Sequence, residues 1–240
     1  MKEILLGRLN KSSLDLIREI GRLAQGMKMN AYLVGGPVRD LWLKQPNVDL
    51  DITVEGNGIR LAEALSENQK GKVAKYPAFG TATVTLPGGR CVDFATARKE
   101  TYVRPGAFPA VVPSDIRNDL FRRDFTINAL AIAINPKIFG TVVDYFGGME
   151  DLQAKKIRVL HDKSFVDDPT RILRAARFKA RLKFAIEPAT LKLLKAAVKA
   201  KALETIKPQR YLKEYNKILK EATQTAALKF LQSWGAWKAL

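Results

Sequence analysis

Two aspartates separated by one residue are the first side chains in this sequence that could do chemistry. Asp49 and Asp51 lie in the segment 48–54, where apolar and polar residues alternate as in a β-strand. Side chains at positions i and i+2 of a strand share a face, so both carboxylates are expected to point the same way. Such a pair suits Mg²⁺, which takes oxygen ligands together with substrate phosphates. Asp93, on another predicted strand, could complete the site or could face water.

A pair of glycines precedes these aspartates. Gly35 and Gly36 follow a predicted strand and precede a predicted helix that carries Arg39 and Asp40. Glycines at such a turn let the backbone approach a phosphate closely and direct the helix N-terminus at it. A Gly-Gly pair alone is usually only a turn, and two aspartates on an exposed strand are usually solvated. Together, the two features favour a metal-dependent phosphoryl or nucleotidyl transfer site.

A second motif contains two arginines and an aspartate in front of an apolar run. Arg122, Arg123 and Asp124 precede apolar residues up to Ile134, and we expect this run to form a buried helix that includes Asn128. Buried charges are costly unless they are paired or bind an anion. A guanidinium group reads phosphate or a sugar edge well. An ion-paired helix terminus is the alternative interpretation.

A third motif lies at the start of a later helix. Asp168 and Arg171 are three residues apart, so they are expected to be neighbours on one helix face, and Arg174 follows on the same helix. One side chain accepts hydrogen bonds and the other donates them, as the recognition of a base edge requires. A carboxylate at a helix start with an i,i+3 ion pair is the alternative, and the motif alone favours it.

The elements that must position these residues fall into two parts. Up to about residue 150, short strands alternate with helices, and strands outnumber the helices that could connect them. This favours a mixed or antiparallel sheet with helices on one side. After residue 150 the pattern is helical, with prolines at helix starts. The expected strands cover 31–34, 48–54, 72–76, 81–86 and 90–94. Ser12 or Ser13 is expected to cap a first helix, and further helices are expected to begin at Ile59, Pro169, Pro188 and Pro208, with a last amphipathic stretch at 228–237. Residues 97–118 are expected to be a mobile loop.

Composition narrows the class of protein. The 240 residues include 41 Lys and Arg against 24 Asp and Glu, a net charge of +17, and 47% hydrophobic residues, which excludes a disordered or fibrous chain. Residues 1–150 carry a net +4 and residues 151–240 a net +13, which favours a polyanionic partner over a merely solvated surface. With one cysteine, Cys91, and one histidine, His161, any metal must be held by oxygen. We expect a cytoplasmic protein without a membrane span.

In this order and with these spacings, the three motifs resemble the class II tRNA nucleotidyltransferases, which comprise bacterial CCA-adding enzymes, their CC-adding and A-adding relatives, and bacterial poly(A) polymerase. The resemblance runs from about Tyr32 to about Lys220. It implies an α+β fold: a DNA polymerase β-like nucleotidyltransferase head with a mixed or antiparallel sheet at 1–150, then an all-helical neck at 151–240. It implies catalytic roles for Asp49, Asp51 and Asp93, Mg²⁺ on Asp49 and Asp51, and nucleotide-binding roles for Gly35, Gly36, Arg39, Asp40, Arg122, Arg123, Asp124, Asn128, Asp168, Arg171 and Arg174.

The activity implied is addition of CCA, or part of it, to the acceptor end of tRNA from CTP and ATP. CC-adding, A-adding and poly(A)-adding enzymes share every motif, and a non-catalytic RNA-binding protein of the same fold is the alternative from another class. The stretch 98–107 is similar to the family's flexible loop, the stretch 144–158 to its head-to-neck hinge, and the stretch 208–219 to the segment that braces the template helix. Asp167 and Gln209 depart from the family, which usually has glutamate at these places.

Overall fold

The computed structural model describes residues 5–45 and 49–237, so Val48 lies outside the described residues. The chain divides into two units that alternate along the sequence. The sheet unit comprises residues up to 99, 111–123 and 127–148; the helical unit comprises residues 100–110, 124–126 and 149 onward. Within the described ranges, no helix is both long and apolar enough to cross a membrane.

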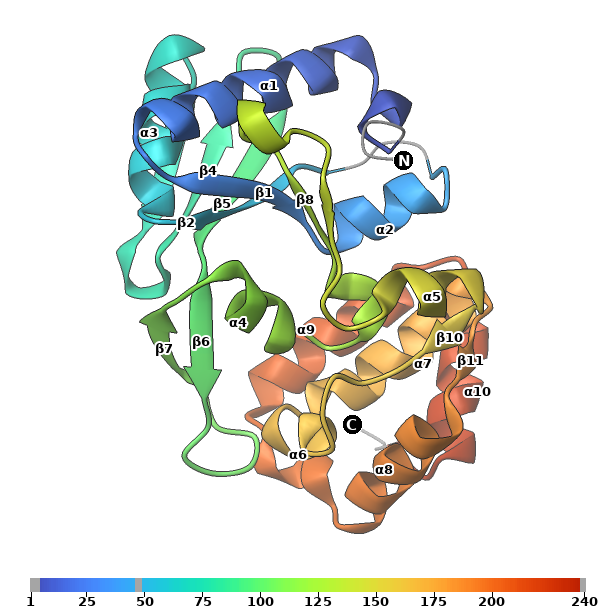
Figure 1. Ribbon diagram of the computed structural model, residues 1–240. Coiled ribbons are helices and arrows are strands. Elements are labelled where there is room, and N and C mark those ends of the chain that lie inside the picture. The colour runs from blue at the N-terminus through green and yellow to red at the C-terminus, as the bar shows by residue number, and fades with distance from the viewer. Residues whose placement is uncertain (1–4, 46–48, 238–240) are drawn as a thin grey trace. The chain divides into compact units, whose positions relative to one another are not determined.

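A seven-stranded mixed sheet forms the centre of the sheet unit (Figure 1). Its strand order is β3-β4-β5-β2-β1-β8-β9, and every neighbouring pair is antiparallel except β2 and β5, which run parallel. The strands are β1 (Asn30–Val34), β2 (Asp51–Glu55), β3 (Lys72–Tyr76), β4 (Thr81–Thr85), β5 (Cys91–Thr96), β8 (Ala131–Ala133) and β9 (Val142–Val143). The predicted mixed sheet in an α+β fold is therefore confirmed.

Two long helices, α1 (Lys11–Gly26) and α3 (Gly58–Asn68), lie along one face of this sheet (Figure 1). Their apolar faces supply fully buried side chains such as Ile17, Ile20 and Leu61 to the core. The N-cap of α1 is Asn10, which accepts the N–H of Ser13, so the prediction of a serine cap was wrong. Two short helices, α2 (Gly36–Trp42) and α4 (Ile116–Phe121), complete the unit.

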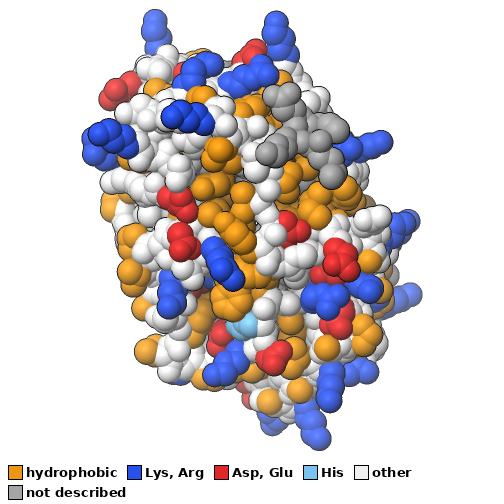
Figure 2. Space-filling view, in the orientation of Figure 1, with side chains coloured by type: hydrophobic (Ala, Val, Ile, Leu, Met, Phe, Trp, Pro, Cys, Tyr) orange, Lys and Arg blue, Asp and Glu red, His pale blue; other side chains and the backbone are white. Residues whose placement is uncertain are grey.

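The helical unit is built around α7 (Thr170–Leu182), which packs against α9 (Pro208–Leu219) and α10 (Gln224–Ser233). Because Leu231 of α10 is fully buried, the last amphipathic stretch packs on the helices before it. The other elements are α5 (Gly148–Gln153), α6 (Ser164–Asp167), α8 (Pro188–Lys199) and the strand pair β10 (Lys156–Ile157) and β11 (Ala185–Ile186). Figure 2 shows lysine and arginine side chains at many separate points of one face rather than in one cluster.

Three predicted elements differ from the structure. The helix expected after Asp124 is a 3₁₀ turn, Thr126–Asn128, followed by β8. The residues from 127 to 134 are almost all fully buried, and a run buried on every side has no amphipathic period that could distinguish a helix from a strand. The segment 97–118 contains the strand pair β6 (Arg98–Thr101) and β7 (Ala110–Pro113) and then α4, rather than one long loop. The strand expected from residue 48 begins at Asp51.

All described residues with positive φ other than glycine are lysines. They lie one or two residues after the ends of six helices, where left-handed backbone usually calls for glycine: Lys28, Lys44, Lys70, Lys155, Lys183 and Lys201. At these places the lysine charge lies near the negative end of the helix dipole, which offsets part of the backbone strain.

Candidate active site

Two acidic residues face each other across the only parallel strand pair in the described sheet. Asp51 pairs with Asp93 in the register of β2 and β5, so the two side chains lie on the same face. The pairing continues one residue beyond β2, because the N–H of Asp93 donates to the carbonyl of Leu50 at 2.9 Å. The Thr83 hydroxyl donates to Asp93 Oδ1 at 2.5 Å. Backbone hydrogen bonds therefore fix the spacing of these two carboxylates.

The charges around Asp51 repel one another. Burial raises the pKa of Asp51 to about 6, Asp93 and Asp49 add to this rise, and Arg123 opposes it. Asp49 is exposed and lies before β2, but it acts on Asp51 through its charge. A cation placed among these carboxylates would remove their repulsion, so the donor set fits Mg²⁺. Within the described ranges, no group of three or more acidic, histidine or cysteine side chains lies close enough together to hold a metal ion.

The glycine turn lies against an arginine in the same unit. Gly35 has a φ of 71°, and a Cβ atom at this position would collide with the Arg123 guanidinium and approach the carbonyl of Asn128. Its N–H donates to the carbonyl of Leu130 at 2.8 Å, which fixes the turn on the chain before β8. Only glycine fits here, and the first and second predicted motifs meet at this position.

Arg39 is buried behind this turn. Its guanidinium makes two hydrogen bonds with the carboxylate of Asp40, at 2.8 and 2.9 Å, and a third with the side-chain oxygen of Asn128. Arg39 is 3% exposed and Asn128 is 6% exposed. These predicted nucleotide-binding residues therefore support the turn from inside, and Gly36 begins α2 above them.

Arg122 and Arg123 share one buried carboxylate, Asp119. Arg122 donates to Asp119 Oδ1 at 2.7 Å and Arg123 to Asp119 Oδ2 at 3.0 Å, and Asp119 is fully buried. Burial favours protonation of Asp119, but Arg123 and Arg122 outweigh it and lower the pKa of Asp119 below its usual value. The Nε of Arg123 is buried and has no hydrogen-bond partner among the described residues. It is the kind of donor that a phosphate oxygen satisfies.

In the helical unit, Asp124 and Arg174 pair with each other. Arg174 donates from Nε at 2.8 Å and from Nη2 at 2.5 Å to Asp124 Oδ2, and its Nη1 lies 3.5 Å from Glu214 of α9. Burial works against the charge of Arg174, but Asp124 and Glu214 outweigh it and raise the pKa of Arg174. This pair ties the segment 124–126 to α7.

Asp168 is held by Thr170, at the start of α7, and by Arg210 of α9. Its Oδ1 accepts hydrogen bonds from the hydroxyl of Thr170 at 2.6 Å, from the N–H of Thr170 at 3.1 Å and from Arg210 Nη2 at 2.9 Å. Arg171 is 4% exposed and donates to the Ser164 hydroxyl at 2.6 Å. Asp168 itself precedes α7, as the C-cap of α6.

Arg210 also binds the loop between β6 and β7. Its Nη1 donates to the carbonyls of Gly106 at 2.9 Å and Ala107 at 3.3 Å, and its guanidinium lies 5.3 Å from the centre of the Phe108 ring. Gly106 has a φ of 66°, and a Cβ atom there would collide with Thr205. One side chain of α9 thus holds both this loop and Asp168.

Comparison with known proteins decides the family. Residues 31–158, just over half of the chain, match the family described as the poly A polymerase head domain. The chain belongs to this family. It is 44% identical over 220 residues to an A-adding tRNA nucleotidyltransferase of Geobacter sulfurreducens, covering 92% of this chain and 25% of that protein. It is 41% identical to a CC-adding tRNA nucleotidyltransferase of Deinococcus radiodurans, covering 92% of this chain and 58% of that protein.

The fold of the Thermotoga maritima CCA-adding enzyme complexed with tRNA CCA is similar, with a TM-score of 0.86 and 44% identity over 98% of this chain and 53% of that one. The predicted resemblance is therefore confirmed. The chain spans between a quarter and somewhat over half of the lengths of these relatives.

Two of the residues that the structure places around the candidate site were not singled out from the sequence. Asp119 lies outside the predicted motifs, and a fully buried carboxylate four residues before Arg123 is the feature that would have pointed to it. Ser164 is a common residue whose role depends on its contact with Arg171. Arg210 lay inside the predicted bracing segment, but its bonds to the loop follow only from the structure.

Proposed function

We propose that this chain is the nucleotidyl-transferring part of a metal-dependent tRNA nucleotidyltransferase, which adds CCA or part of it to the tRNA 3′ end from CTP and ATP in the cytoplasm. The observation that carries the proposal is the gathering, in one unit, of Asp51 and Asp93 in register and of Gly35 against Arg123. The relatives named as A-adding and CC-adding enzymes support it.

In this reaction the RNA 3′-oxygen forms a bond to the α-phosphorus of the nucleotide, the bond to the β-phosphate oxygen breaks, and pyrophosphate leaves. Asp49 and Asp51 would hold Mg²⁺, with Asp93 as the neighbouring third carboxylate, and the ion would neutralise charge on the phosphates. Arg123, with its orphan Nε, binds the triphosphate beside the Gly35 turn, while Arg39 and Asn128 keep that turn in place.

Asp168 and Arg171 select the base in this proposal. All three hydrogen bonds to Asp168 described above reach Oδ1, so we assign Oδ2 as the acceptor for a base amino group. Arg171 supplies donors for the ring nitrogen or carbonyl of the base. Arg210 is a positioning residue, because it fixes Asp168 without contacting the nucleotide.

For the domains we propose a catalytic head at 1–150 and a helical neck at 151–240, with the loop 100–110 and the segment 124–126 serving the neck as parts of the helical unit. The excess of 21 basic over 8 acidic residues after residue 150 supports salt-dependent binding of the tRNA acceptor end.

Incorporation into three tRNA transcripts tests the proposal. The transcripts end before CCA, after C and after CC, and each is incubated with Mg²⁺ and one labelled nucleotide at a time. A CCA-adding enzyme extends all three with the correct nucleotide, an A-adding enzyme extends only the last, a CC-adding enzyme only the first two, and a poly(A) polymerase adds many A residues. Binding of tRNA without incorporation under any metal would leave the RNA-binding alternative.

A further inference from the structure

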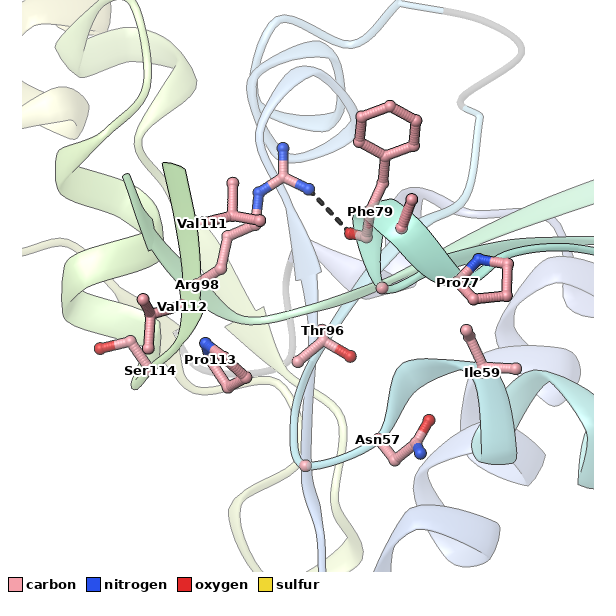
Figure 3. A pocket seen from close by; sticks show the side chains of 13 residues that line it. Asn57, Ile59, Pro77, Phe79, Thr96, Arg98, Val111, Val112, Pro113 and Ser114 are labelled. Atoms are coloured by element: carbon pink, nitrogen blue, oxygen red, sulfur yellow. Dashed lines mark hydrogen bonds between the residues drawn. The ribbon is translucent and has the colours of Figure 1, made fainter. Parts of the chain in front are cut away.

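A pocket of about 560 Å³ lies in the sheet unit, away from the residues assigned above. Its lining comes from the ends of β2 and β5, the turn before α3, the 3₁₀ turn Pro77–Phe79 and β7 (Figure 3). Asp51 begins β2, whereas the pocket begins with Gly56, just after that strand ends. Asp51 precedes the lining residue Gly56 by five residues and Asp93 precedes the lining residue Thr96 by three, so at about 3.3 Å per residue the carboxylates lie about 10 to 17 Å along the strands from the pocket lining. The pocket is therefore a separate site.

Apolar side chains make up much of the wall of this pocket. Pro77, Phe79 and Pro113 contribute rings from two different segments, and Ile59 closes the wall toward α3 (Figure 3). Phe79 is 59% exposed and Val112 is 61% exposed, although the core of this unit buries most apolar side chains of their size. Exposed apolar side chains that gather around a hollow are typical of a binding surface rather than of a folding requirement.

A cation lies at the edge of the pocket. Arg98 Nη1 donates to the carbonyl of Phe79 at 2.9 Å, which holds the guanidinium next to the aromatic residue (Figure 3). Two carboxylates adjoin the pocket lining in sequence: Glu55 accepts the N–H of Ile116, and Asp115 accepts the N–H of Asn118 and caps α4. The polar lining otherwise consists of uncharged groups such as Asn57 and Thr96. The local charge is therefore suited to a phosphate.

We propose that this pocket binds one unpaired nucleotide of the RNA substrate, with its base against Phe79 and its phosphate at Arg98. Single-stranded RNA is commonly held by an aromatic ring that stacks on a base together with a basic group that contacts the backbone. A few nucleotides of single-stranded RNA span such a distance, so an unpaired stretch can reach from the carboxylates to the pocket. The identity of the ligand as RNA rests on the proposed function.

Equilibrium binding tests this site without catalysis. A labelled oligoribonucleotide of six unpaired residues is titrated with the full chain, and fluorescence anisotropy gives the dissociation constant. Phe79→Ala is expected to weaken binding about tenfold, because stacking on one aromatic residue supplies a factor of this size. Phe79→Trp is expected to bind as the unaltered chain does, and its added tryptophan emission should be quenched by the stacked base.

The control variant is Ile138→Ala, which truncates another exposed apolar side chain of the sheet unit, 43% exposed, and should leave binding unchanged. A blunt-ended, fully base-paired RNA duplex should bind Phe79→Ala and the unaltered chain equally. Equal binding of the unpaired oligonucleotide by Phe79→Ala and the unaltered chain, or no quenching in Phe79→Trp, overturns the proposal. Failure of the proposed function appears differently, as absence of nucleotide incorporation while binding and its dependence on Phe79 persist.

Discussion

The candidate carboxylates of the sheet unit and those of the helical unit differ in how their negative charge is balanced. In the sheet unit, Asp51 and Asp93 face each other with like charge, and the pKa of Asp51 rises. In the helical unit, Asp124 is paired with Arg174 and Asp168 with Arg210. In the first arrangement Arg123 offsets the negative charge only in part, so that a cation would complete it, whereas in the second the carboxylates are already paired. A base that binds Asp168 must therefore add to an existing hydrogen-bond network rather than fill a gap.

The largest expected effect comes from removing the like charges of the sheet unit. Asp51→Asn should lower nucleotide incorporation by about a thousandfold, because a carboxylate that holds the metal contributes on the order of 4 kcal/mol to the barrier. The same change should not lower the free energy of unfolding, since it removes a repelled, partly buried charge. Single-turnover incorporation and urea unfolding measure the two quantities. Full activity in this variant would contradict the metal assignment.

The opposite result is expected at Asp119, a fully buried carboxylate of the sheet unit that pairs with two arginines. Asp119→Asn should lower the free energy of unfolding by about 3 kcal/mol, because it leaves Arg122 and Arg123 without their buried partner. Asp115→Asn, at the N-cap of the same helix, is the matched control and should change stability little, since asparagine caps as well as aspartate.

The pH dependence of the free energy of unfolding is a second test of the ion pairs of Asp119. The pKa of Asp119 is lower in the folded chain than in the unfolded chain. Its contribution to stability is therefore complete above the usual aspartate pKa, near 4, and is lost as the pH falls through the lower folded value. Urea unfolding between pH 6 and pH 3 should show a smaller loss of stability in Asp119→Asn than in the unaltered chain. Parallel curves for the two proteins would argue against this.

A smaller effect, on specificity, is expected at Arg210 in the helical unit. Arg210→Lys keeps a positive charge but loses the fork that binds Asp168 and the loop carbonyls together. We expect the preference for one nucleotide over the other, as the ratio of kcat/KM for ATP and CTP on a transcript ending in CC, to fall about tenfold. Lys213→Gln, an exposed residue of the same helix, should leave this ratio unchanged. A uniform loss with both nucleotides would indicate a structural role only.

The smallest expected effect is a change in the free energy of unfolding, measured for the same type of substitution in each unit. Lys183→Gly after α7 and Lys70→Gly after α3 should each raise the free energy of unfolding by about 0.5 kcal/mol, because glycine adopts positive φ without strain. Lys183→Ala should instead lower it, since the strain stays and the charge is lost. If the two units unfold together, thermal unfolding shows a single transition, and each glycine variant raises its midpoint temperature. Two transitions, each shifted by one variant, would show that the units unfold separately.

Local sequence patterns predicted the β1 and β2 strands, the proline-started helices and the fold class, because alternation and proline placement act over a few residues. They did not reveal that Asp51 lies beside Asp93, since the parallel pairing of β2 and β5 joins residues 42 positions apart. The apolar run after Asp124 was predicted as a helix and is a turn and a strand, because burial on all sides removes the period. The link from Arg210 to Gly106 spans 104 positions and has no local signature.

The lysines that follow six helices change how the basic composition should be interpreted. They account for six of the 41 lysine and arginine residues, and their places are explained by the need to end a helix with a favourable charge where another chain would use glycine. Part of the high isoelectric point therefore reflects how this chain terminates its helices and carries no information about a nucleic-acid partner. Three of the six, Lys155, Lys183 and Lys201, belong to the 21 basic residues after residue 150, so the way helices end accounts for part of that excess as well.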